Sequence, residues 1–100
     1  MAEWMAFVKK ENVKKAENAL RTDFDVAAKQ SITVKDARSL GMKEEGSFFY
    51  ISGTEEGIKR CQELIKGMTA QIDQKHLDKA REEIKKEEEA AAEGMGGIFG

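Results

Sequence analysis

Residues 48–66, with the sequence FFYISGTEEGIKRCQELIK, decide the fold class. The first four of these residues are apolar on both faces of an extended chain, which is typical of a strand in the middle of a sheet. Thr54 then has the position of a helix N-cap, with Glu55 and Glu56 placed favourably in the first turn. Further on, apolar residues recur at helical spacing and form one inward stripe: Ile58, Cys61, Leu64 and Ile65. A central strand followed by an amphipathic helix that ends at Gly67 indicates a domain of mixed α and β structure.

The residues before this stretch predict further strands and helices. Residues 4–8 are apolar on both faces, and we interpret them as a strand. Residues 11–21 form an amphipathic helix, because apolar residues recur at i, i+3 and i+7 (Val13, Ala16 and Leu20). Residues 24–33 alternate apolar and polar side chains and predict a half-buried strand, with Gln30 interrupting the pattern.

A short helix is expected next. Thr33 with Asp36 three residues later resembles an N-terminal cap, and Gly41 has the position of a left-handed C-terminal cap. Between them, three apolar residues share one face: Val34, Ala37 and Leu40.

These elements predict a small α+β body at about residues 3–67, a two-layer sandwich with helices packed on one face of a short antiparallel or mixed sheet. We divide the chain into an α+β body (residues 1–69), a protruding charged helix (70–93) and a flexible, apolar-tipped tail (94–100). Charge supports this division, because residues 70–93 hold five of the 17 basic and eight of the 19 acidic residues. The helix therefore carries −3, and the remaining 12 basic and 11 acidic residues give the body +1.

Composition excludes several classes of protein. A net charge of −2 and a pI near 5.5 do not supply the strong positive field of a typical basic nucleic-acid-binding domain. No apolar run approaches 18 residues, and the first ten residues lack the features of a signal peptide. A single cysteine fits a reducing compartment, so we expect a cytoplasmic protein without a membrane span.

The predicted charged helix has few apolar residues: Ile72, Leu77, Ala80 and Ile84. Its first half is expected to dock on the body or on a second copy, which leaves a homodimer through residues 70–84 open. Its second half is expected to be solvated.

Catalytic chemistry is not indicated. His76 is the only histidine and has no cysteine near it in sequence, and Cys61 falls on the apolar face of its helix. The acidic runs lack the spacing of a calcium loop, and residues 94–97 are neither preceded by a strand nor followed by a lysine as a nucleotide loop would be. We therefore expect no enzyme, no metal site and no cofactor.

The last 16 residues, KKEEEAAAEGMGGIFG, resemble the C-terminal end of the archaeal acidic ribosomal stalk proteins. In that family a charged stretch leads to a mobile terminal peptide that recruits translational GTPases by inserting apolar residues into a hydrophobic groove. The resemblance implies that Met95, Ile98 and Phe99 are the partner-binding anchors, with Gly94, Gly96 and Gly100 matching the family's glycines. Met95 and Ile98 stand where leucine is usual, and Gly97 replaces an alanine.

This resemblance implies a non-catalytic interaction protein of archaeal-type translation. An apolar tip on a polar arm also favours a partner on physical grounds, because a short amphipathic helix in a groove is a common recognition mode. The alternative is that the tail folds back over an apolar edge of the body.

Residues 48–66 are also similar to the closing strand and helix of KH-like domains. That resemblance implies a degenerate nucleic-acid-binding module, although residues 1–69 lack the family's Gly-x-x-Gly loop. The candidate RNA contacts are Lys9, Lys10, Lys14 and Lys15, with Tyr50 as a stacking surface.

Overall fold

The computed structural model describes the backbone of residues 1–99 and the side chains of residues 1–89. Its strands are β1 (Ala2–Lys9), β2 (Ser31–Asp36), β3 (Gly46–Gly53) and β4 (Thr69–Ala70). Its α-helices are α1 (Val13–Arg21), α2 (Glu55–Leu64) and α3 (Gln74–Phe99). Three short 3-10 helices lie between them: η1 (Lys10–Asn12), η2 (Ala27–Lys29) and η3 (Ala37–Leu40).

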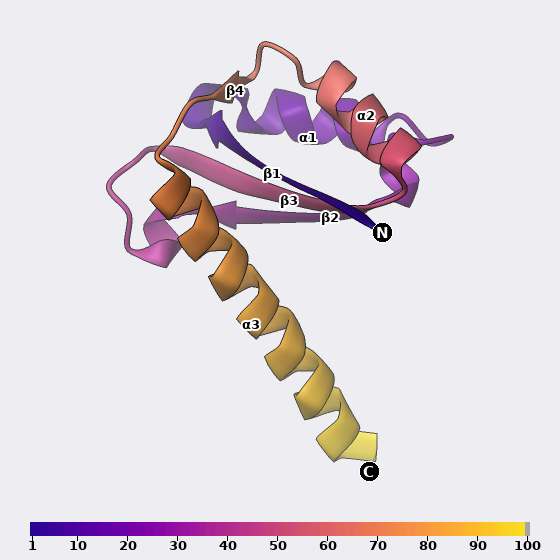
Figure 1. Cartoon of the computed structure of the whole chain (residues 1–100), viewed down its shortest axis with the longest axis vertical. Helices are drawn as coiled ribbons and strands as arrows, with labels where there is room; N and C mark the ends of the chain where they lie inside the picture. Colours follow the sequence, from indigo (N-terminus) through magenta and orange to yellow (C-terminus); the bar gives the residue numbers. More distant parts are fainter. Residues whose placement is uncertain (100) are drawn as a thin grey trace.

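The four strands form one sheet in the order β2-β3-β1-β4, and all neighbours are antiparallel. With α1 after β1 and α2 after β3, this is the split β-α-β arrangement of ferredoxin-like folds. α1 and α2 cover one face of the sheet, which we call the first face, and α3 crosses the opposite, second face (Figure 1). The α+β class is confirmed. The sequence predicted a two-layer body and left open whether the first half of the charged helix docks on the body or on a second copy, whereas α3 forms a third layer on the body.

The central strand β3 is buried on both faces because each face is covered. Phe49 and Ile51 point toward α1 and α2, while Phe48 and Tyr50 point toward α3. All four are 4% exposed or less, so the prediction of a central strand at residues 48–51 is confirmed. On the second face Phe48 lies opposite Phe7 of β1, with ring centroids 5.2 Å apart.

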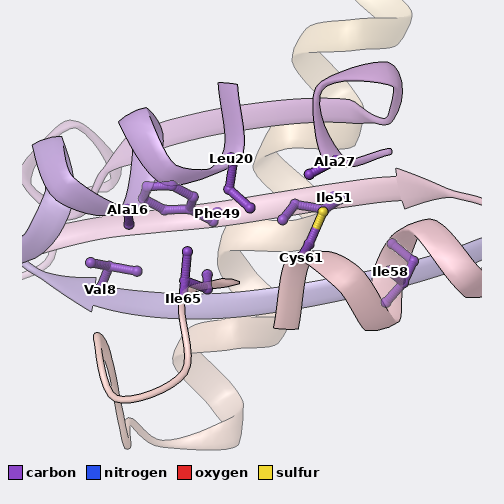
Figure 2. Close-up of a cluster of buried hydrophobic side chains, with 9 residues drawn as sticks. All are labelled: Val8, Ala16, Leu20, Ala27, Phe49, Ile51, Ile58, Cys61 and Ile65. Atoms are coloured by element: carbon purple, nitrogen blue, oxygen red, sulfur yellow. The ribbon is translucent and has the colours of Figure 1, made fainter. Parts of the chain in front are cut away.

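The main core lies on the first face, and Figure 2 shows its side chains converging between β1, β3 and the two helices. The apolar stripes predicted for α1 and α2 contribute side chains to this core. Its buried members, all labelled in Figure 2, are Val8, Ala16, Leu20, Ala27, Phe49, Ile51, Ile58, Cys61 and Ile65.

The predicted cap of α2 is confirmed, and a second side chain supports it. The Gly57 N–H donates to Thr54 Oγ1 at 3.0 Å. The Thr54 N–H in turn donates to Gln30 Oε1 at 3.0 Å, and Gln30 Nε2 donates to the Val26 carbonyl at 2.9 Å. A Cβ on Gly57 would lie 2.1 Å from Gln30 Cδ, so glycine leaves the space that this amide fills. Gln30, which interrupts the alternation in sequence, therefore ties the start of β2 to the start of α2.

The predicted strand at residues 24–33 is wrong for residues 24–30 and confirmed for residues 31–33, which belong to β2. The Ala27 N–H donates to Asp23 Oδ2 at 3.0 Å, and Arg60 Nε donates to the same oxygen at 3.1 Å. These bonds fold the chain into a turn and η2, and the strand begins only at Ser31. Phe24, expected to be half-buried, is 74% exposed.

The predicted helix between Thr33 and Gly41 is also shifted. Residues up to Asp36 pair with β3 as strand β2, and only η3 follows. Asp36 rather than Thr33 caps it, by accepting the Arg38 N–H at 3.0 Å. Gly41 has φ +78°, so the left-handed C-terminal cap is confirmed. The β-branched residues at 32–34 favour the strand over the helix.

The cap of α2 yields a stability prediction. Thr54→Ala removes the acceptor for the Gly57 N–H and is expected to lower the free energy of unfolding by about 1 kcal/mol. Thr54→Ser keeps a hydroxyl and serves as the control. Urea unfolding of the three proteins checks this, and equal loss in both variants would contradict a role for the hydroxyl.

Candidate protein-interaction site

The first half of α3 is anchored on the second face of the sheet by apolar contacts. Ala80 packs with Phe7 and Phe48 in a second core cluster, and Leu77 and Ile72 pack against its edge. Ile84, one turn after Ala80, is 1% exposed. The sparse stripe predicted to dock on the body or on a second copy thus packs within one chain, with Ala80 and Ile84 buried and Ile72 and Leu77 half-buried.

Next to this apolar anchor, charged groups clamp α3 to the strands. Arg81 donates to Glu3 of β1, and Lys85 Nζ lies 3.4 Å from the same carboxylate. Further along, Lys35 Nζ of β2 lies 2.7 Å from Glu87 Oε1, and the Thr33 hydroxyl donates to Glu88 Oε1 at 3.3 Å. We call these contacts the α3 clamp. They follow the helix across the sheet from β1 to the edge strand β2.

Electrostatics at the β1 end of the clamp favour an ionised Glu3. A hydrogen bond from the Tyr50 hydroxyl is the largest cause that holds the pKa of the Glu3 carboxyl below its ordinary 4.5. Desolvation opposes it and is next in size, and the hydrogen bonds from Arg81 and Lys85 lower the pKa further. Burial, and then the bond to Glu3, raises the pKa of Tyr50. The same carboxylate raises the pKa of Arg81. These shifts keep Glu3 ionised and Arg81 protonated at neutral pH.

The clamp predicts a pH dependence of stability. Because folding lowers the pKa of Glu3, its contribution is fully present above about pH 4.5 and is lost as the pH falls through the lower folded-state value. The melting temperature of the native protein should therefore exceed that of Glu3→Gln near neutral pH, and the difference should disappear as the pH falls from about 4.5 through the lower folded-state pKa of Glu3. Thermal melts across this range check the prediction. A difference that stays constant with pH would contradict it.

Beyond the clamp, α3 continues away from the body. Among the side chains of residues 1–89, the last one along α3 that bonds to the sheet is Glu88. The helix backbone runs on to Phe99, and Figure 1 shows it projecting past β2. The sequence predicted a separate tail at residues 94–100, whereas the helix bounds include residues 94–99. The predicted anchors Met95, Ile98 and Phe99 have side chains outside the described residues, as does all of Gly100, so their role stays a prediction.

Of the candidate RNA contacts, the four lysines lie in one region of the surface, whereas Tyr50 lies elsewhere. Lys9, Lys10, Lys14 and Lys15 are all exposed, around the end of β1 and the start of α1. Lys10 and Lys14 line a shallow hollow of about 410 Å³, but acidic side chains line it as well: Glu11, Asp36 and Glu45. One of these, Glu45, pairs with Arg38 at 3.3 Å, so the hollow carries no strong positive charge.

Tyr50 is not a stacking surface in this structure. Its side chain is 4% exposed and lies under α3, where its hydroxyl meets Glu3. The lysines on α1 belong to the opposite face of the sheet. The predicted pairing of Tyr50 with a basic helix is therefore wrong, because the strand register points the ring toward α3.

The two remaining side chains with possible chemical reactivity, Cys61 and His76, lie in different environments. Cys61 is buried in the main core, and desolvation, with a smaller effect of Asp23, raises the pKa of its thiol. His76 Nδ1 lies 3.8 Å from Glu44 Oε1. Among the described residues no group of three histidine, cysteine or acidic side chains could hold a metal ion. In the same residues no helix has the length and apolar character to cross a membrane.

Comparisons with protein-family models, with curated proteins and with solved structures found no match. The candidate site consequently rests on the geometry of α3 and on the sequence of its end. The α3 clamp could not be found from sequence, because Glu3 and Arg81 are separated by 78 residues. The only local signal was the short stripe that includes Ala80 and Ile84.

Proposed function

We propose that this protein is a non-catalytic interaction protein that binds a partner protein through the end of α3, with Met95, Ile98 and Phe99 as apolar anchors. The resemblance of residues 85–100 to the end of the archaeal acidic ribosomal stalk proteins supports a translational GTPase as the partner. We accordingly propose a cytoplasmic location and a role in archaeal-type translation.

The observation that supports this proposal most is the division of α3 into a docked half and a projecting half. Among residues 1–89, whose side chains the structure describes, all members of both core clusters precede position 81, the buried Ile84 follows them, and the last residue of the clamp is Glu88. The following ten or so helical residues extend about 15 Å at 1.5 Å per residue. A partner could therefore reach residues 94–100 without displacing the sheet or its helices.

The proposal is tested by a truncation after Glu93. The shortened protein is expected to keep the melting temperature of the full chain, because the described cores and the clamp remain, and to lose binding to translation elongation factors. Thermal melts and a binding titration on the same samples separate the two effects. A large loss of stability would contradict the proposal and favour a tail that folds back on the body.

A further inference from the structure

A trough runs along the open edge of β1, apart from the end of α3. Two adjoining hollows of about 390 Å³ each form it, and they share Trp4, Met5 and Leu77. Ile72 lines one end, and Asp78 and Arg81 of α3 line the other. We call this surface the edge trough.

The floor of the edge trough has free backbone hydrogen-bonding capacity. β1 pairs with β3 along all of its residues from Ala2 to Lys9. On its other side it pairs with β4 only at Phe7 and Val8, after which the chain leaves the sheet to begin α3. Ala2–Ala6 consequently have no strand partner on that side within the described part of the chain. Backbone N–H and C=O groups at such an edge are a template for an added strand.

The other edge of the sheet is protected, which makes this one distinctive. β2 carries Lys35, and α3 passes over it through the contacts of Glu87 and Glu88 before projecting beyond the sheet. A strand added beside β2 would meet that helix. By contrast, residues 2–6 contain no lysine, arginine or proline, and their one charged residue, Glu3, is held by the α3 clamp.

The two sides of the trough differ in chemistry, and this defines what could occupy it. On the first face the neighbours of an added strand would be apolar or small: Ala2, Trp4 and Ala6. On the second face they would be Glu3, Met5 and the wall of α3. In that wall Asp78 accepts a hydrogen bond from Gln74 Nε2 at 3.0 Å but forms no ion pair with any described residue. A third hollow adjoins this end of the trough and is lined by Asp78, Arg81, Glu82 and Lys85. There Glu82 also forms no ion pair with a described residue, whereas Arg81 and Lys85 share the single carboxylate of Glu3. These five charged groups sum to −1.

We infer that the edge trough binds an extended segment of a partner protein, which adds to β1 as a strand in line with β4. The segment has apolar side chains on the face of Trp4 and basic side chains toward Asp78 and Glu82. It pairs antiparallel to Ala2–Ala6, because it continues the direction of β4. This surface lies on the body, so its binding is independent of residues 94–100.

The test is a titration of the full-length, ¹⁵N-labelled protein with short synthetic peptides of alternating valine and lysine. One matched peptide carries N-methyl groups on alternate residues, which removes its pairing hydrogen bonds, and another replaces lysine by glutamate. We expect saturable binding of the first peptide, amide shift changes and exchange protection at residues 2–6, and at least tenfold weaker binding of both matched peptides. The double variant Asp78→Asn/Glu82→Gln should bind the first peptide about threefold more weakly.

Equal binding of the N-methylated peptide would overturn the inference, because strand pairing would then contribute nothing. Shift changes centred on β2, or no binding of any peptide, would overturn it as well. Protection of residues 2–6 that appears without peptide and grows with protein concentration would assign the trough to a second copy of the chain instead. Sedimentation velocity at the concentrations of the titration distinguishes that outcome.

Discussion

Replacing Phe49 by alanine is expected to lower the free energy of unfolding by about 3–5 kcal/mol. Phe49 is fully buried on the central strand, and its ring fills the main core between α1 and α2 (Figure 2). Removing it loses the burial of the ring and leaves a cavity that Val8 and Leu20 cannot close without moving the helices. For a domain of this size the loss is a large part of the total stability.

Urea unfolding followed by far-UV circular dichroism measures this effect. Phe24→Ala is the matched control, because Phe24 is 74% exposed and its removal should change stability by no more than about 0.5 kcal/mol. Similar losses in the two variants would contradict the placement of Phe49 in the core and of Phe24 on the surface.

The second large effect concerns the attachment of α3. Ile84 is 1% exposed, and Ile84→Ala is expected to cost about 2 kcal/mol or more. The substitution should weaken the contacts of the α3 clamp before it unfolds the sheet. Arg81, Lys85 and Glu87 reach their partners on the strands only while the helix is packed against the sheet. In Ile84→Ala we therefore expect amide hydrogen exchange at residues 81–89 to be faster than in the native protein. This increase should be larger than the one in β3, where exchange follows global unfolding.

Lys86→Ala is the control for this experiment, since its side chain is 72% exposed on the same turn of helix. It should leave both the unfolding free energy and the exchange rates close to those of the native protein. Unchanged exchange at residues 81–89 in Ile84→Ala would contradict the account of how α3 is anchored.

The parts of the fold that the sequence predicted well are those in which local pattern and tertiary packing agree. Residues 48–51 are apolar on both faces, and the structure covers both faces of β3. Thr54 and the following stripe of α2 needed no distant partner to be recognised, because capping and periodicity are local properties.

The errors occurred where distant residues override the local pattern. The alternation at residues 24–33 was outweighed by Arg60, 37 residues away, which binds the Asp23 carboxylate and stabilises a turn. Gln30 interrupts the same alternation because its amide serves α2 rather than its own strand. Docking of the charged helix on the body could not be distinguished from docking on a second copy for a similar reason, since Glu3 and Lys35 lie far from their helix partners in sequence.

The same distinction between local pattern and distant contacts applies to the candidate site. The sequence predicted the anchors at the end of α3 from residues 85–100 alone, while the clamp and the edge trough depend on the register of β1 and became apparent only in the structure. Tyr50 shows the limit of reading exposure from sequence, because the direction of a side chain on a strand depends on its register and on what covers that face.

The central claim, that the end of α3 binds a partner, is tested most directly by fluorescence anisotropy of the labelled full-length protein titrated with translation elongation factors. A Phe99→Ala variant is titrated in parallel, and its melting temperature is measured to confirm that the body is unchanged. We expect saturable binding by the native protein and its loss in the variant. Equal binding by both, or no binding by either, would contradict the claim.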